Sequence, residues 1–413
     1  MSELLPEGSL AVVLSADQQT RNGDQHYLYR QNSNLFYLTG INLPGAVLVL
    51  CPHHPDPGLR EVLFIEQPDP VKETWFGKML TKQEASAVSG VNTIKWLNEL
   101  DAVLRDMILR SASIWLEFNE YAKYSTELHY RQHRFAKQIM EWYPAHSLQR
   151  LTPLITQLRV VKSDEEIELL RKACQITGEA FQRILGFVKP GIMEYEAEAE
   201  ITHEFLRKGV RNHAYAPIIA SGRNALILHY IENNRRMNEG DLLLLDFGAE
   251  VNYYAADLSR TLPVNGKFSR RQRACYDAVL RVQKAATELF VPGNTIDKVN
   301  KEVWMMMEEE MIQLGLFTRQ EVKSQDPSSP LVNKYLMHGV SHFLGLDVHD
   351  VGDKYLPFEP GMVLTLEPGI YIPEENIGIR IENDIVVGDP PEDLMKSIPR
   401  EAEEIESIMQ SGR

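Results

Sequence analysis

The pattern of apolar runs along residues 1–150 is typical of an α/β domain. Short apolar runs bounded by turn residues are expected to form strands at residues 10–14, 35–38, 46–50, 62–65 and 113–118. Between them, apolar positions recur with helical spacing at about residues 92–109 and 125–142. The composition changes after Tyr143-Pro144, and residues 151–161 are expected to connect this domain to a second one at 162–413.

The second domain is expected to contain two halves built on the same plan. In the first half, a capping box of Ser163 and Glu166 predicts the start of a helix that runs to about residue 188. A second helix is expected at residues 195–208, followed by strands at 216–220 and 226–230 and then a hairpin. The second half repeats the two helices, from residue 270 to the Pro292-Gly293 pair and over residues 296–314.

A short sequence repeat supports this division. EGDLLLLDFG (239–248) aligns with EPGMVLTLEPG (359–369) when Gly240 is matched to Gly361, and an acid in each half then falls at the same place. We therefore expect two structurally similar halves that face each other across a shared site.

Two acids lie in the predicted hairpin of the first half. Asp246 follows the apolar run 242–245, and Asp257 lies on a return strand that is expected to begin at residues 251–254. A carboxylate at the end of a core strand must be paired, hydrogen-bonded or bound to a metal, because burying a bare charge is costly. For the hairpin alone, two aspartates facing water at a turn are the simpler interpretation.

The second half supplies two further acids. Glu367 follows its core strand, and Glu382 lies in the alternating segment IGIRIENDIVV (377–387), in which Arg380 and Glu382 face the same side. One histidine from HGVSHFLGLDVHD (338–350) completes a set that suits Mn²⁺, Fe²⁺, Co²⁺ or Zn²⁺. Four acids need more positive charge than one divalent ion supplies. The set therefore indicates a two-metal site that hydrolyses its substrate with a metal-activated hydroxide.

The composition narrows the class of protein. The chain has 413 residues, of which 44% are hydrophobic and 24% charged, as in globular proteins of two or three domains. A net charge of −15 argues against nucleic acid or an anionic membrane as the main partner. The N-terminus carries Glu3 and no basic region, so no signal peptide is expected. Three separated cysteines, Cys51, Cys174 and Cys275, form no disulfide or metal motif, and a cytoplasmic location is expected.

Taken together, the motifs resemble the metal-dependent aminopeptidases and prolidases of the pita-bread fold, and within them the aminopeptidase P (Xaa-Pro aminopeptidase) family. The resemblance is carried by LHYIEN (228–233), LLLLDFGAEVNYYAADLSRTLPVNGKFS (242–269), MHGVSHFLGLDVHDVG (337–352), GMVLTLEPGIYI (361–372) and GIRIENDIVV (378–387). YRQNSNLFYLTGINLPGAVLVL (29–50) and ETWFG (73–77) resemble the family's N-terminal domain. The resemblance implies an α/β creatinase-like N-terminal domain followed by a catalytic pita-bread domain with an internal pseudo-two-fold repeat.

The resemblance also implies a ligand set. The implied metal ligands are Asp246, Asp257, His342, Glu367 and Glu382. Of these, Asp257 and Glu382 would bridge two divalent ions, with Mn²⁺ favoured over Zn²⁺, Co²⁺ or Fe²⁺. Glu367 would also take the proton from the attacking water.

Other residues receive roles from the same resemblance. The implied active-site histidines are His229, His338 and His349, which would hold the substrate and the transition-state oxygen. Arg380 and Tyr371 would lie beside the metals. Trp75, expected in a loop, would reach the active site of a neighbouring subunit in a homodimer or homotetramer.

The implied activity is hydrolysis of the first peptide bond of peptides with proline in second position. Prolidase, which performs the same chemistry on Xaa-Pro dipeptides alone, is the alternative. A catalytically inactive binding protein of the same fold is disfavoured because such proteins lose ligands and all five positions are intact. Metal-free relatives that hydrolyse creatine are disfavoured for the same reason, and a methionine aminopeptidase would not need the N-terminal domain.

Overall fold

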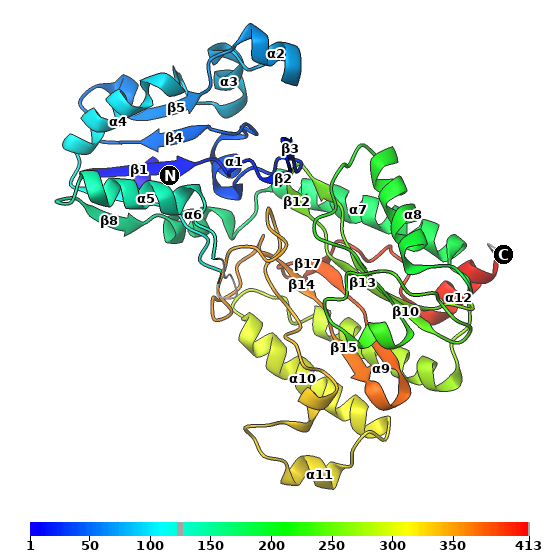
Figure 1. Cartoon of the computed structure of the whole chain (residues 1–413). Helices are drawn as coiled ribbons and strands as arrows, with labels where there is room; N and C mark the ends of the chain where they lie inside the picture. The colour runs from blue at the N-terminus through cyan, green and yellow to red at the C-terminus, as the bar shows by residue number, and fades with distance from the viewer. Residues whose placement is uncertain (122–126, 412–413) are drawn as a thin grey trace. The chain divides into compact units, whose positions relative to one another are not determined.

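The computed structural model describes residues 1–121 and 127–411. These form two compact units, Met1–Arg159 and Val160–Arg413 (Figure 1). Within the segment expected to connect the domains, helix α6 (Thr152–Arg159) ends the first unit. Among the described residues, no helix combines the length and apolar character that crossing a bilayer requires.

The first unit is built on a six-stranded mixed sheet with the order β6-β5-β4-β1-β7-β8. Its strands are β1 (Ser9–Leu14), β4 (Val47–Leu50), β5 (Glu61–Ile65), β6 (Thr93–Trp96), β7 (Ser113–Leu116) and β8 (Ser147–Arg150). All six residues of β1 are buried, and successive side chains join different apolar clusters, Leu10 on one side and Ala11 on the other. A strand covered on both faces needs apolar residues at every position, which explains its continuous apolar sequence.

Helices cover both faces of this sheet. Helices α1 (Ser33–Thr39), α3 (Lys82–Ser89) and α6 supply residues to the cluster that contains Ala11. Helices α4 (Leu100–Leu109) and α5 (Arg131–Trp142) supply residues to the cluster that contains Leu10. The unit also contains α2 (Pro70–Phe76) and a short hairpin of β2 (Thr20–Asn22) and β3 (Gln25–His26).

Three sequence predictions for this unit are wrong in type or extent. The run at 35–38 forms helix α1, because the Asn32 side chain accepts hydrogen bonds from two backbone amides and Gly40, at φ 64°, ends the helix. Residues 92–109 contain strand β6 before helix α4, since β6 pairs with β5. Helix α5 begins only at Arg131, and residues 125–126 of its predicted start lie outside the described residues.

The second unit has the predicted two halves. The first contains α7 (Asp164–Phe187), α8 (Glu194–Arg207) and a sheet of β9 (Ile218–Ser221), β10 (Leu242–Phe247) and β13 (Leu258–Pro263) in the order β13-β10-β9. The second contains α9 (Arg270–Thr287), α10 (Ile296–Gln313) and a sheet of β14 (Val363–Leu366), β17 (Asn383–Val386) and β18 (Glu392–Asp393) in the order β14-β17-β18. Strands β15 (Gly369–Ile372) and β16 (Ile377–Arg380) pair separately, and α11 (Arg319–Ser324) and α12 (Ala402–Ser411) complete the unit.

Corresponding turns lead into the core strand of each half. Gly240 and Gly361, which the sequence repeat aligns, both adopt the left-handed conformation, at φ 82° and 88°. Each precedes a core strand, β10 or β14, that pairs antiparallel with a later strand, β13 or β17. The halves also bond to each other, since the Glu382 amide donates to the Ser259 carbonyl at 3.0 Å. The internal repeat therefore brings the strand ends of the two halves together.

Three local predictions for this unit are corrected. Residues 251–254 form a tight hairpin of β11 (Glu250–Val251) and β12 (Tyr254–Ala255), with φ 48° and 70° at its turn, and the strand returning along β10 is β13. Residues 226–230 form no strand, because the 3₁₀ helix η4 (Gly222–Leu226) occupies the start of this segment. The segment 377–387 divides into β16 and β17 on either side of Glu382.

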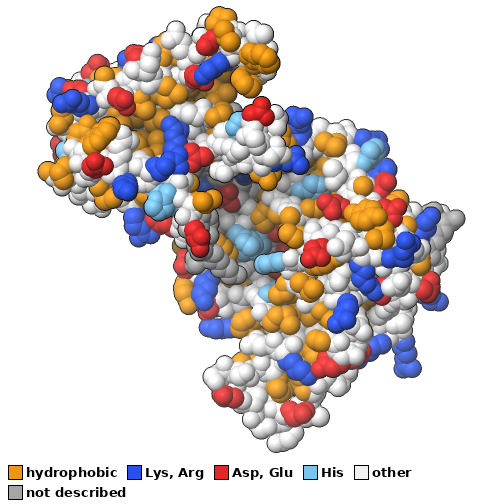
Figure 2. Space-filling view, viewed as in Figure 1, with side chains coloured by type: hydrophobic (Ala, Val, Ile, Leu, Met, Phe, Trp, Pro, Cys, Tyr) orange, Lys and Arg blue, Asp and Glu red, His pale blue; other side chains and the backbone are white. Residues whose placement is uncertain are grey.

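Charged residues of both signs are spread over the face drawn in Figure 2. Acidic and basic side chains are interspersed there with apolar ones. On this face the net negative charge of the chain is thus distributed rather than gathered into a single area.

Candidate active site

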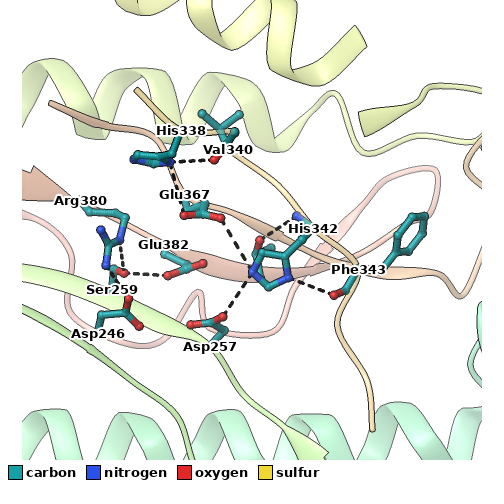
Figure 3. A network of polar contacts seen from close by, with 12 residues as sticks. Asp246, Asp257, Ser259, His338, Val340, His342, Phe343, Glu367, Arg380 and Glu382 are labelled. Atoms are coloured by element: carbon teal, nitrogen blue, oxygen red, sulfur yellow. Dashed lines mark hydrogen bonds and ion pairs between the residues drawn. The ribbon is translucent and has the colours of Figure 1, made fainter. Parts of the chain in front are cut away.

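The four candidate carboxylates lie where the core strands of the two halves end. Asp246 is the penultimate residue of β10, and Asp257 directly precedes β13. In the other half, Glu367 directly follows β14, and Glu382 directly precedes β17. Figure 3 shows that these side chains and His342 converge from different elements.

Three of the predicted ligands form a compact group that could hold a metal ion. Asp257, His342 and Glu382 each offer one donor atom, and these atoms all lie within 4.8 Å of one another. His342 Nε2 is 3.4 Å from Asp257 Oδ2 and 3.8 Å from Glu367 Oε1. The two carboxylates of the group are 5% and 2% exposed. Buried oxygen donors facing one imidazole nitrogen fit a divalent cation.

The orientation of His342 also fits a ligand. Its Nδ1 lies 3.0 Å from the carbonyl oxygen of Phe343 (Figure 3). A carbonyl can only accept a hydrogen bond, so Nδ1 carries the proton and donates. In the neutral ring, Nε2 is then left with its lone pair directed at the carboxylates, which is the usual arrangement of a metal-binding histidine.

The pKa values of the site carboxylates indicate that they repel one another and would be stabilised by nearby positive charge. Burial, reinforced by the charges of Asp257, Glu367 and Asp246, raises the pKa of Glu382 well above its ordinary value. Burial also raises the pKa of Glu367 to about 7 and outweighs the opposing effect of His342 and Arg380. The pKa of Asp246 is raised for the same reason, with Asp257 adding repulsion. Bound cations would relieve this repulsion between buried carboxylates.

The pKa of His342 is raised as well, but for this residue a raised pKa favours the charged form. Burial by itself would lower the pKa of His342. The contacts with Asp257 and Glu367 outweigh burial and raise the pKa to about 9. These carboxylates therefore favour positive charge at Nε2, which a proton or a metal ion would supply.

Arg380 fixes the position of two candidate ligands from the other side. Its guanidinium forms an ion pair with Asp246 and donates through Nε to Ser259 Oγ at 2.7 Å. The Ser259 hydroxyl in turn donates to Glu382 Oε2 at 2.7 Å. Arg380 and Glu382 therefore do face the same side, as the alternation predicted, although Arg380 ends β16 and Glu382 lies in the break between β16 and β17.

His338 and Tyr371 extend this network. The Arg380 guanidinium donates through Nη1 to the Tyr371 hydroxyl at 2.9 Å. His338 Nδ1 lies 2.7 Å from the Gly339 carbonyl oxygen and must be the protonated nitrogen. Its Nε2 therefore accepts a hydrogen bond from the Tyr371 hydroxyl at 2.9 Å. His338 also lies 3.7 Å from Glu367, so it borders the carboxylates.

Two residues of the site were missed by the sequence analysis. The hydroxyl of Tyr215 contacts Oδ1 of both Asp246 and Asp257, and Ser259 links Arg380 to Glu382. Ser259 could have been found, because it lies two residues after Asp257 and so on the same face of β13. Tyr215 precedes β9 and has no spacing that relates it to the acids, so only the packing reveals it.

The remaining predicted residues lie at exposed positions. The His349 ring is 4.4 Å from the His342 ring and nearly perpendicular to it. His229 is exposed in the segment between η4 and β10. Trp75 is 78% exposed and lies in helix α2, not in the loop that the sequence predicted. Pro70 at the first position and the Asp69 cap favour this helix.

Comparison with known proteins agrees with the two-domain fold. The model of metallopeptidase family M24 matches residues 168–389, and that of the aminopeptidase P N-terminal domain matches residues 1–115. The chain is 39% identical to the Xaa-Pro aminopeptidase of Escherichia coli K12, covering 100% of this chain and 96% of that protein. It is 32% identical to human Xaa-Pro aminopeptidase 3, covering 96% and 80%.

Solved structures show the same similarity. Zinc-substituted E. coli aminopeptidase P in complex with product superposes with a TM-score of 0.89 at 37% identity, covering 100% of this chain and 96% of that one. The family models, the full-length relatives and the shared two-domain fold lead to one assignment. The chain is a metallopeptidase that belongs to family M24 and carries the N-terminal domain of aminopeptidase P.

Proposed function

We propose that the protein removes the first residue from peptides with proline in second position, using two divalent metal ions. The observation that carries the proposal is the convergence of three buried carboxylates, the partly buried Glu367 and His342 at the strand ends of both halves. The relatives matched over 99–100% of this chain include the Xaa-Pro aminopeptidases of Escherichia coli and Haemophilus influenzae.

Five residues would hold the metals: Asp246, Asp257, His342, Glu367 and Glu382. Asp257 and Glu382 would bridge both ions. The oxygen-rich ligand set favours Mn²⁺, with Zn²⁺, Co²⁺ and Fe²⁺ as alternatives. When bound, two such ions supply a hydroxide nucleophile near neutral pH and polarise the scissile carbonyl.

Residues in and around the ligand set would transfer protons, hold the substrate and keep the metal ligands in position. Glu367 would take a proton from the attacking water and pass it on. His349, His338 and His229 would hold the substrate and the carbonyl oxygen as negative charge develops there. Arg380, bonded to Asp246 and through Ser259 to Glu382, would keep both ligands in place.

The proposed substrate explains why a proton donor is needed. An Xaa-Pro bond is a tertiary amide, and its nitrogen leaves as part of the pyrrolidine ring. That nitrogen is a poor leaving group unless it is protonated as the bond breaks. Glu367, after accepting the proton of the water, would return it to the proline nitrogen.

Substrate length separates the proposal from its alternative. A prolidase must close its site behind the proline, whereas an aminopeptidase leaves that side open. We expect Xaa-Pro-Yaa tripeptides to be cleaved at least as fast as Xaa-Pro dipeptides. An assay of the released first residue at equal substrate concentrations checks this. Cleavage confined to dipeptides would identify a prolidase, and a metal-loaded protein that cleaves neither would favour a binding function.

We further propose that the protein assembles as a homodimer or homotetramer in which Trp75 contacts substrate in a neighbouring subunit. Trp75 and Phe76 are 78% and 86% exposed on helix α2, where Figure 2 shows a group of apolar side chains. Large exposed aromatic residues are enriched at interfaces.

Replacing Trp75 with alanine should weaken substrate binding without changing metal content. We expect KM for a tripeptide to rise several-fold, because a buried aromatic contact contributes about 1 kcal/mol or more. Steady-state kinetics and metal analysis by mass spectrometry measure the two effects. Trp142→Ala, which removes another exposed tryptophan of the same unit, is the matched control. An unchanged KM would exclude Trp75 from the site.

A further inference from the structure

The second unit contains a buried ion pair that is not among the predicted site residues. Lys162 Nζ lies 3.0 Å from Asp350 Oδ2, and each side chain is only 1% exposed. A buried ion pair is costly to desolvate, and an apolar pair of similar volume is often equally stable. Stability alone therefore does not account for charges at this position, and a role in fixing geometry has to be considered.

The lysine end of the pair is anchored to the strand that leads to Glu367. The Lys162 amide donates to the Gly361 carbonyl at 3.0 Å, and the neighbouring Val161 pairs with Met362. Gly361 and Met362 directly precede β14, which ends just before Glu367. Lys162 therefore has a fixed position relative to one wall of the candidate site.

The aspartate end closes the segment 343–350, which we call the His349 loop. The Asp350 amide donates to the Phe343 carbonyl at 2.9 Å, so the two ends of the loop are bonded to each other. Gly345 packs directly on the ion pair, since a Cβ there would lie 2.3 Å from Asp350 Oδ2 and 3.0 Å from Lys162 Cε. The loop therefore rests on the pair with no space between them.

The same loop contacts the candidate site at two points. The Gly345 carbonyl accepts a hydrogen bond from the amide of Ala255 at 2.9 Å, two residues before Asp257. His349 immediately precedes Asp350, and its ring lies 4.4 Å from the ring of His342. A displacement of Asp350 would therefore move His349 relative to the predicted ligands.

We propose that Lys162 and Asp350 are positioning residues that hold the His349 loop so that His349 meets the substrate in the geometry that turnover requires. The inference rests on the proposed hydrolytic function. The ion pair supplies a strong, directional bond between residues far apart in the sequence, which an apolar contact would not replace.

The test replaces the pair by apolar residues of similar size. In Lys162→Met/Asp350→Leu neither partner is left as an unpaired buried charge, so the fold should be retained. We expect kcat for an Xaa-Pro-Yaa peptide to fall roughly 10–100-fold, the effect of a small misplacement of a catalytic group. Metal content and the thermal unfolding midpoint should stay near those of the original protein. Normal turnover in this variant would overturn the proposal.

A double-mutant cycle shows whether the pair acts through His349. In a His349→Ala background, the same double substitution should reduce kcat by less than about twofold, because the group that it positions is already absent. An equal reduction in both backgrounds would mean that the pair has only a general structural role. Lys301→Met/Asp297→Leu, made at an exposed ion pair on α10, is the matched control and should leave kcat unchanged.

Chemical labelling tests the geometry without relying on activity. In metal-free protein, the rate at which diethyl pyrocarbonate modifies His349 should change several-fold in the double variant, while that of the exposed His53 in the other unit stays constant. If Lys162→Met/Asp350→Leu does not fold, Lys162→Gln/Asp350→Asn gives the same readout, since it removes the ion pair, leaves no buried charge unpaired and nearly retains both side-chain shapes. An unchanged labelling rate would refute the positioning role. Altered labelling in a protein that hydrolyses no Xaa-Pro peptide would retain that role and refute the proposed function instead.

Discussion

Asp257→Asn should abolish hydrolysis and remove metal from the protein. Asp257 is 5% exposed and lies beside His342 and Glu382 in the group that could hold an ion. A neutral amide cannot replace a carboxylate shared by two cations. We therefore expect kcat/KM to fall by at least about 10³-fold, more than the 10–100-fold effect of losing a residue that only supports a ligand.

The measurement combines a hydrolysis assay with metal analysis of protein purified without chelator. Asp297→Asn, the same substitution at a partly exposed position of α10, controls for the loss of one negative charge. It should remain within about twofold of the original activity, as surface changes usually do. An Asp257→Asn variant that keeps two tightly bound metals and substantial activity would contradict the ligand assignment.

His349→Ala should reduce turnover strongly while leaving the metals in place. The His349 ring lies against the His342 ring but not within the group of candidate ligands. If its nitrogen donates to the oxygen that becomes negative during attack, its loss should cost about 2.7–4 kcal/mol, or 10²–10³ in kcat.

Turnover and metal content are measured on the same preparation of His349→Ala. The control is His53→Ala, at an exposed loop position. Loss of metal from His349→Ala would instead identify His349 as a ligand and call the assignment of His342 into question. A change confined to KM would assign His349 to substrate binding rather than to transition-state stabilisation.

Structural features that depend only on residues close together in the sequence could be predicted from the sequence. The capping box of Ser163 and Glu166 begins α7 where expected, since it consists of two hydrogen bonds within one helical turn. The turns at Gly240 and Gly361 follow from local sequence in the same way, and their repetition revealed the two similar halves. The acids at the strand ends could be named because they interrupt or follow apolar runs.

Features that depend on pairing partners were harder to predict. Residues 93–96 were included in a helical pattern but form β6, because β5 offers a parallel edge that the local sequence does not reveal. The partner strand of β10 was misplaced for a similar reason. The turn at Asn252 and Tyr253 uses left-handed backbone in non-glycine residues, which only the surrounding fold maintains.

The sequence by itself determined the class of fold, the division into two similar halves and the identity of the acids and histidines that could bind metal. These are recorded in local patterns and in motifs that resemble a known family. Only the tertiary structure decided which donor atoms meet, with Tyr215 beside Asp246 and Asp257, Ser259 between Arg380 and Glu382, and Lys162 beneath the His349 loop. The reason is physical, since Lys162 and Asp350 lie 188 positions apart and no local pattern records a contact that the packing of strands and loops creates.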